Sequence, residues 1–223
     1  MLKKNKKVVV FGVLDTAELA HYYLTHDSEC EVVAFTVSRE YIKEPFFKGL
    51  PVVAFEEVEV LYNPANYYFF APMTGRRMNK NREDIYNKAK AKGYRFISYI
   101  SSKATLFDNS VGDNCFILED NTIQPFATIG NDVVIWSGNF IGHHSAVKDH
   151  VFCAPNGVLL GNGTAESYCF IGANATIREY TTLAEGTLVA MGANIIRNTE
   201  AWSVYTGNPA RKKQNVISTD IYA

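Results

Sequence analysis

Residues 139–177 read NFIGHHSAVKDHVFCAPNGVLLGNGTAESYCFIGANATI, and an apolar side chain returns at every sixth position. The same period continues in both directions, so that it covers fifteen positions from Val111 to Ile195 without a slip of phase. A second series, made mostly of small residues, lies two positions before each of these apolar residues. The periodic apolar residues are Val111, Ile117, Ile123, Ile129, Ile135, Ile141, Val147, Cys153, Leu159, Ala165, Ile171, Ile177, Leu183, Val189 and Ile195.

Period six fits neither an α-helix nor an alternating strand. It is the hexapeptide signature of a parallel β-helix, in which three hexads form one triangular coil. Fifteen hexads predict about five coils, and a spacing of roughly 4.7–4.9 Å between paired strands gives a prism on the order of 20–25 Å tall. The aliphatic side chain of each hexad is expected to fill this prism.

The N-terminal part of the chain follows a different pattern. Apolar strands are expected at 6–12, 31–37, 66–72 and 94–100, with a short strand before a helix at 55–62 and a second helix at 79–92. A further helix is expected to start at a cap formed by Asp15 and Thr16. Because strands and helices alternate, we predict a small, Rossmann-like parallel sheet in residues 1–102. Residues 103–223 are then expected to form a parallel β-helix with a C-terminal tail.

Composition excludes several classes of protein. The 223 residues carry a net charge of −1, and beyond the first seven residues the longest run of Lys and Arg has three members (211–213), which argues against nucleic acid as a partner. No stretch reaches the roughly 18 apolar residues of a membrane span, and no secretory signal is recognisable. We therefore expect a cytoplasmic protein without a membrane partner. Three of its four cysteines, Cys115, Cys153 and Cys169, fall on inward positions of the hexads and are expected to be core residues.

The loop after the first strand is a candidate nucleotide site, because ligands dock at the carboxyl ends of parallel strands. Its sequence, Gly12-Val13-Leu14-Asp15, lacks the second and third glycines of a dinucleotide fingerprint, which disfavours a tightly cradled pyrophosphate. A basic, amide-rich loop offers donors for a diphosphate and a base, although it also fits a solvated helix start. Its candidate residues are Arg76, Arg77, Asn79, Lys80 and Arg82.

Residues eighteen apart stack on the same corner of successive coils. This spacing places His143, Gly161, Glu179 and Arg197 on one edge and His144 beneath Asn162. Ala173 and Met191 stack on a different edge, one face of the prism away. A homotrimer, in which edges of neighbouring chains face each other across a groove, is therefore the economical arrangement.

His143 and His144 occupy a corner where Gly, Asp or Asn would suffice. A neutral imidazole can accept a proton from an attacking group, and the Gly161 N–H on the next coil can stabilise a carbonyl oxygen. A base beside a backbone donor is the minimum for acyl transfer through a tetrahedral intermediate. A surface or metal-binding histidine pair is the alternative. His150 stacks with Asp132 and Tyr168 on the third edge, where a structural hydrogen bond is expected.

The last segment, VYTGNPARK (204–212), leaves the hexad register. Trp202 and Tyr205 are expected to cover the top of the prism. Arg211, Lys212 and Lys213 place positive charge near the upper end of the groove, where it suits a ligand with phosphates.

Several segments together resemble the left-handed β-helix acyltransferases: the hexads, IGHHS (141–145), CFIGANATIRE (169–179) and VYTGNPAR (204–211). More narrowly, the chain is similar to nucleotide-sugar N-acetyltransferases and sialic-acid O-acetyltransferase-like enzymes. GLPVVAF (49–55), MNKNRED (78–84) and GYRFISYISSKAT (93–105) look most like the branch that acetylates 4-amino-4,6-dideoxy sugars such as dTDP-viosamine. The resemblance implies a trimer that uses acetyl-CoA and no metal.

The resemblance also implies residue roles. His143 would be the general base, with His144 able to share or take that role, and the Gly161 N–H would contact the thioester carbonyl. The remaining implied contacts are Gly161, Asn162, Ala173, Met191, Ala210 and Arg211 for acetyl-CoA, and Gly12, Asp15, Thr36, Asn79 and Arg82 for the sugar nucleotide.

The chain departs from this pattern at two positions. His144 stands where relatives acting on the related amino sugar usually carry a carboxylate, so what orients His143 is open. Phe152 replaces a ligand-contacting histidine.

These observations predict an acetyl-CoA-dependent N-acetyltransferase that acts on a nucleotide-linked 4-amino sugar. Three alternatives stay open: a sugar O-acetyltransferase, a non-catalytic sugar-nucleotide binding protein, and a carbonic anhydrase-like metalloenzyme. The last would use His143, His144 and His150 across a subunit interface.

Overall fold

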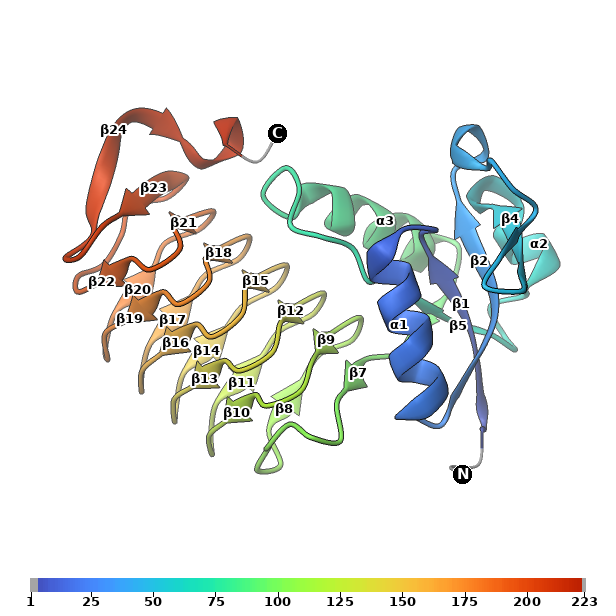
Figure 1. Ribbon diagram of the computed structural model, residues 1–223, viewed down its shortest axis with the longest axis horizontal. Helices are drawn as coiled ribbons and strands as arrows, with labels where there is room; N and C mark the ends of the chain where they lie inside the picture. Colours follow the sequence, from blue (N-terminus) through green and yellow to red (C-terminus); the bar gives the residue numbers. More distant parts are fainter. Residues whose placement is uncertain (1–3, 222–223) are drawn as a thin grey trace.

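The computed structural model describes residues 4–221 and shows two parts side by side, an α/β sheet with its helices and a ladder of short strands (Figure 1). The first part contains a six-stranded sheet in the order β3-β4-β2-β1-β5-β6. All neighbours in it pair in parallel except β3 and β4, which form a hairpin. Its strands are β1 (Lys6–Phe11), β2 (Cys30–Val37), β3 (Phe46–Phe47), β4 (Leu50–Ala54), β5 (Tyr68–Phe70) and β6 (Arg95–Phe96).

Three helices belong to this part: α1 (Asp15–His26), α2 (Val58–Leu61) and α3 (Lys80–Ala91). The predicted side-chain cap of α1 is wrong, because Asp15 already lies inside the first turn and Leu14 is the capping residue without a side-chain hydrogen bond. Short 3-10 turns occur at Arg39–Tyr41, Phe55–Glu57 and Ser218–Asp220. No described helix is long and apolar enough to cross a membrane.

The predicted strand at 94–100 is in fact two strands with different partners. Phe96 pairs with Phe69 in the first sheet, whereas β7 (Tyr99–Ile100) pairs with Phe116 and Ile117 of the ladder. An apolar run cannot reveal this exchange, because periodicity reports burial and not the identity of the partner strand.

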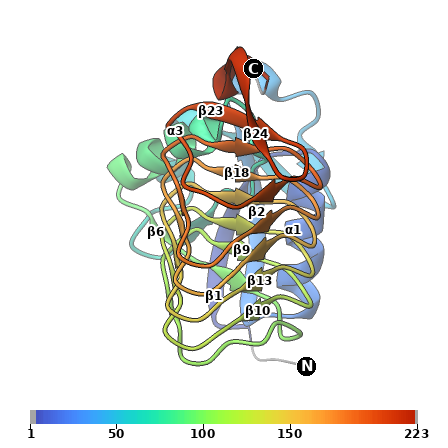
Figure 2. The same ribbon diagram turned by 90° about the vertical axis from the view of Figure 1, so that its left-hand side faces the viewer.

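The ladder is a parallel β-helix with three sheets of two-residue strands, as the period of six predicts. Successive strands in each sheet pair at a spacing of eighteen residues, for example Ile123 with Ile141. Figure 2 shows the coils stacked one above another. The first sheet contains β10 (Thr122–Ile123), β13 (Phe140–Ile141), β16 (Val158–Leu159), β19 (Thr176–Ile177) and β22 (Asn194–Ile195). The second contains β8 (Ser110–Val111), β11 (Thr128–Ile129), β14 (Ala146–Val147), β17 (Thr164–Ala165) and β20 (Thr182–Leu183).

The third sheet is longer, because strands outside the hexads extend it at both ends. It begins with β7 and ends in the antiparallel pair of β23 and β24, which lies over the last coil (Figure 2). After β7, its members in order are β9 (Phe116–Ile117), β12 (Val134–Ile135), β15 (Phe152–Cys153), β18 (Phe170–Ile171), β21 (Leu188–Val189), β23 (Ser203–Thr206) and β24 (Arg211–Ile217).

The second residue of each hexad strand points into one continuous core. Fourteen of the fifteen periodic residues belong to this buried cluster, and Val111 packs against it from the end. Cys115, Cys153 and Cys169 lie in the same cluster as free thiols, which confirms their predicted core position. Tyr205 packs against the cluster as predicted, but Trp202 does not, since its ring joins the outer core described next.

A second core joins the two parts of the molecule. On the third sheet the first residue of each hexad strand is large and apolar, and these side chains pack with β1, β2 and α1. On the second sheet the same position is small or polar, from Ser110 to Thr182. The α/β part therefore covers only the third face of the prism. The covering residues of the third sheet are Phe116, Val134, Phe152, Phe170 and Leu188.

Candidate active site

The His143 side chain lies directly against the backbone of Gly161 in the next coil. A Cβ atom built on Gly161 would stand 2.7 Å from Nε2 and 2.8 Å from Cε1 of His143, so a larger residue at this position would displace the imidazole. Asn162 N–H donates to the His143 carbonyl at 2.9 Å, which fixes the two coils in this register. The predicted stacking of His143 with Gly161 is therefore confirmed.

The Gly161 N–H has no acceptor within the described chain, although its carbonyl accepts from Tyr180 N–H at 3.2 Å. The residue is half-buried and next to an exposed imidazole. An uncommitted backbone donor beside a proton acceptor has the composition of an oxyanion site.

His143 and His144 contact each other through their rings. The two Nδ1 atoms are 3.1 Å apart, and the Nε2 edge of His143 faces Gly161. Gln124 from the preceding coil accepts a hydrogen bond from His143 N–H at 3.0 Å. The Phe126 ring stacks against His144 with a centroid separation of 4.7 Å. Both histidines remain exposed, so a ligand can reach them from solvent.

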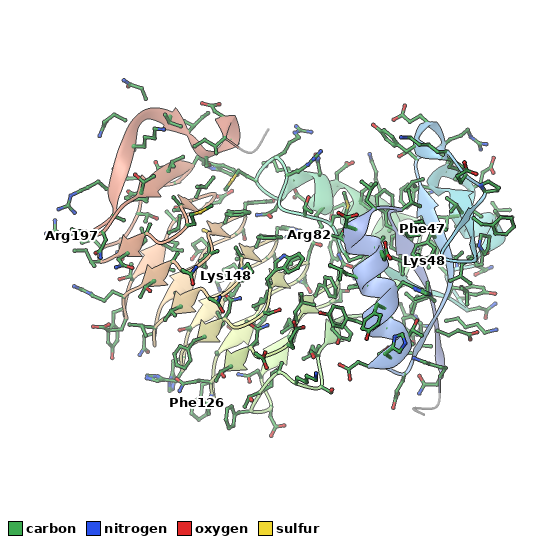
Figure 3. The ribbon with its side chains drawn as sticks, in the orientation of Figure 1. Phe47, Lys48, Arg82, Phe126, Lys148 and Arg197 are labelled. Carbon is green, nitrogen blue, oxygen red and sulfur yellow. The ribbon has the colours of Figure 1, made fainter. Side chains whose placement is uncertain are left out.

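Large aromatic side chains stand exposed on the same edge. Phe126 is 73% exposed and Tyr180 is 75% exposed, and both have a positive φ, which is costly for a bulky side chain. Figure 3 shows Phe126 at the outer margin of the β-helix, away from the α/β part. In one chain this edge is therefore an uncovered apolar margin.

Ala173 and Met191 stack on another edge, as their spacing predicts. Gly192 N–H donates to the Ala173 carbonyl at 2.8 Å, and Met191 is 80% exposed. The face made by β13, β16, β19 and β22 separates this edge from His143. One chain therefore brings Ala173 and Met191 together but does not bring them to His143.

A pocket of about 220 Å³ lies at the top of the prism. Figure 3 shows Arg197 at that end of the β-helix. Lys212 forms an ion pair with Glu200 at 2.6 Å, and this hydrogen bond raises the pKa of Lys212. Two arginines of the pocket have no such carboxylate partner among the described residues. The pocket is lined by Ile195, Ile196, Arg197, Asn198, Tyr205, Ala210, Arg211 and Lys212.

The loop after β1 brings together three of the predicted sugar-nucleotide residues. Gly12 has a φ of +110°, and its N–H donates to the Thr36 carbonyl at 2.9 Å. Thr36 is fully buried and its hydroxyl donates to Val53. Asp15 is exposed at the start of α1. Gly12 and Asp15 are thus accessible to a ligand, whereas Thr36 supports the loop from behind.

Asn79 and Arg82 have no exposed surface. The Arg82 guanidinium pairs with Asp132 of the β-helix, with an Nε–Oδ2 distance of 3.1 Å. Asn79 donates to the Tyr168 carbonyl at 3.1 Å. Figure 3 shows Arg82 between α3 and the prism. Both side chains therefore hold the two parts of the molecule together.

Asp132 connects Arg82 to the second histidine edge. Its Oδ2 lies 2.8 Å from Nδ1 of His150, and Asn114 donates to Oδ1 at 2.6 Å. His150 also stacks on Tyr168 with an interplanar angle of 17°. The structural hydrogen bond expected for His150 is confirmed. No group of three His, Cys, Asp or Glu residues suited to a metal ion occurs among the described residues of one chain.

Comparison with known proteins identifies the architecture. Residues 110–143 match the family model described as bacterial transferase hexapeptide (six repeats). The acetyltransferase domain of PglB from Neisseria gonorrhoeae superposes with a TM-score of 0.84 at 20% identity, covering 94% of this chain and 100% of that chain. The chain has this acetyltransferase fold.

Two further structures share the fold. A mutant of perosamine N-acetyltransferase from Caulobacter crescentus, in complex with CoA and GDP-perosamine, gives a TM-score of 0.81 at 19% identity and covers 94% of this chain and 97% of that chain. WeeI from Acinetobacter baumannii gives a TM-score of 0.79 at 20% identity, with 94% and 100% covered. The PglB domain has also been solved with acetyl coenzyme A.

Sequence reasoning missed two neighbours of the His143–His144 pair, Gln124 beside His143 and Phe126 beside His144. Gln124 and Phe126 belong to the coil below, and counting back eighteen from Gly142 and His144 gives their positions. Phe152 lies 8% exposed in the core between the two parts and stacks on Phe170.

Proposed function

We propose that the protein is an acetyl-CoA-dependent N-acetyltransferase that acetylates the 4-amino group of a nucleotide-linked 4-amino-4,6-dideoxy sugar. The observation that carries the proposal is the contact of the exposed His143 ring with Gly161, whose N–H is uncommitted. The shared fold with a perosamine N-acetyltransferase bound to CoA and GDP-perosamine supports this substrate class.

The reaction is direct transfer without a covalent enzyme intermediate. The neutral amine nitrogen attacks the thioester carbonyl carbon, and Nε2 of His143 takes the proton that the nitrogen loses. The Gly161 N–H stabilises the negative oxygen of the tetrahedral intermediate. The C–S bond then breaks, and the thiolate of CoA receives the proton from His143, which returns as a neutral base.

Acetyl-CoA is proposed to run along the groove beside the prism. Ala173 and Met191 would contact the pantetheine arm through their backbone, and Asn162 would lie beside the thioester. The pocket with Ala210 and Arg211 offers an exposed guanidinium for the phosphates at the adenine end.

Because His143 and Met191 stand on different edges, a complete site requires a second copy of the chain. We therefore propose a homotrimer with sites between subunits. The uncovered aromatic margin at Phe126 and Tyr180 supports this arrangement, since exposed apolar patches mark association surfaces.

The sugar nucleotide is proposed to enter from the α/β part. The Gly12 backbone and the Asp15 carboxylate are the accessible groups at the end of β1, with Thr36 behind them. Asn79 and Arg82 would act indirectly, by holding α3 against the prism. We propose a dTDP-linked sugar such as dTDP-viosamine, on the resemblance of residues 49–55, 78–84 and 93–105.

The test is a CoA-release assay over dTDP-, UDP- and GDP-linked 4-amino sugars, with matched hydroxyl-only sugars as a second panel. Turnover of at least one amino sugar and loss of turnover in His143→Ala is the expected result. Turnover of only the hydroxyl acceptors would replace N-acetylation by O-acetylation. No CoA release from either panel would exclude this acetyl transfer.

A further inference from the structure

His144 directly follows His143, and the role inferred for it below rests on the proposed function. The Nδ1 atoms of His143 and His144 are 3.1 Å apart, within hydrogen-bonding distance. We propose that His144 is the positioning residue of the site: it accepts a hydrogen bond from His143 Nδ1–H and thereby keeps the lone pair of His143 on Nε2.

The argument follows from the proton inventory of imidazole. A neutral histidine has one N–H and one lone pair, so a contact between two Nδ1 atoms requires a proton on only one of them. His143 must keep Nε2 free to accept the proton of the amine, and its own proton therefore resides on Nδ1. His144 then must be neutral, with its proton on Nε2. The contact selects one tautomer for each ring.

The local backbone aims His144 at this contact. His144 has a φ of +57°, a left-handed conformation in which Asn, Asp and His are enriched. The stacked Phe126 ring, at 4.7 Å and 35°, limits the rotation of the imidazole. Gln124 holds the His143 backbone on the other side. The pair is thus fixed by contacts from the coil below.

No described carboxylate or cation forms a hydrogen bond or ion pair with either ring. The neutral pair can take up one proton at Nε2 of His143 and keep this hydrogen bond. A second added proton would bind Nδ1 of His144 and place two Nδ1–H donors against each other, which removes the hydrogen bond. The pair therefore works in its neutral form and passes through a singly protonated form during transfer. The titratable residues along this corner are Asp108 below the pair and Arg178, Glu179, Tyr180 and Arg197 above it.

The first experiment measures kcat, KM and the pH profile of CoA release for the parent, for His143→Ala and for three variants of His144. His144→Ala should lose roughly 10- to 100-fold in kcat, less than the ~10²–10⁴-fold expected for loss of a general base, with KM nearly unchanged. His144→Asn should recover most of the rate, because its Oδ1 accepts a hydrogen bond and Asn tolerates a positive φ. His144→Asp should stay active, and the acid limb of its pH profile should move to higher pH, because a carboxylate stabilises the His143 imidazolium.

Two outcomes would overturn the proposal. His144→Ala with the kcat and pH profile of the parent would show that the contact has no role. An inactive His144→Ala beside an active His143→Ala would make His144 the base.

The second experiment does not depend on finding a substrate. Nitrogen-15 NMR of the intact protein distinguishes protonated from unprotonated imidazole nitrogens at each ring. The His143 proton should reside on Nδ1 in the parent and in His144→Asn, and should distribute over both nitrogens in His144→Ala. A proton on His143 Nε2 in the parent would refute the dyad, whereas the correct tautomer without CoA release would refute only the proposed activity.

Discussion

Two corners of the same prism carry histidines. The corner of His150 is covered by the α/β part, and the corner of His143 and His144 is open to solvent. His150 is hydrogen-bonded to the buried carboxylate of Asp132 and covered by Tyr168 and α3. Among the described residues, the His143 ring has a hydrogen-bond partner only in the His144 imidazole, and it stays open to solvent. His143 and His150 both stand on turns between hexad strands, and what covers each corner decides its role. The covered corner should control stability, and the open corner should control activity.

The largest effect is expected on the open corner. His143→Ala should lower kcat by about 10²–10⁴-fold with CoA binding nearly unchanged, because it removes the proton acceptor. Steady-state kinetics with the best amino sugar measure this. The matched control is His150→Ala, which removes an imidazole from the covered corner and should leave the kcat of the folded enzyme within a few-fold of the parent. Equal losses in both variants would contradict the division between corners.

On the covered corner, Arg82→Met should reduce the free energy of unfolding by about 3–5 kcal/mol, because it leaves the buried Asp132 without its guanidinium partner. Urea denaturation measures the change. Lys88→Met on the same helix is the control, since its ion pair with Asp84 is exposed and contributes only about 0.3–0.5 kcal/mol. If both variants unfold at similar urea concentrations, the buried ion pair does not hold the two parts together.

Gly161→Ala tests the close approach on the open corner. The new Cβ would stand 2.7 Å from His143 Nε2, so the imidazole must move away. A displaced base should cost roughly 10- to 100-fold in kcat, within the contribution of general base catalysis. Melting temperature should change little, because His143 is exposed. An unchanged kcat would show that the observed ring position is not the reactive one.

The smallest effect is expected where α1 meets the β-helix. Burial raises the pKa of Asp27, but hydrogen bonds from Ser102, Tyr99 and Ser101 outweigh it, and the net shift is downward. The pKa of Asp27 is therefore lower in the folded protein than in the unfolded chain. The stabilisation that ionised Asp27 contributes is fully present at pH values above the unfolded pKa, and it is lost as the pH falls through the folded pKa. Asp27→Asn should therefore reduce stability by about 1 kcal/mol at neutral pH and less at acid pH. Denaturation at several pH values measures this; a constant difference would contradict it.

The repeats made most of the fold predictable. The period of six predicts which residue of each hexad points inward, and the spacing of eighteen predicts that His143 stacks with Gly161 of the next coil, as the structure shows. The prediction failed at strand 94–100 and at the cap of α1, where the outcome depends on a tertiary partner. It could not foresee that Arg82 and Asn79 are buried, because a basic loop has the same sequence whether it faces solvent or a neighbouring surface.

The register of eighteen also limits how the chain can change its length. Insertion of eighteen residues adds one coil and leaves every column of the prism in line. Insertion of six residues keeps the inward aliphatic phase and preserves the core, yet it turns everything above it by one face. Such an insertion between His143 and Gly161 would leave a well-packed protein whose histidine lies beneath another corner. Viable length variation in this prism therefore comes in whole coils or in loops that leave it.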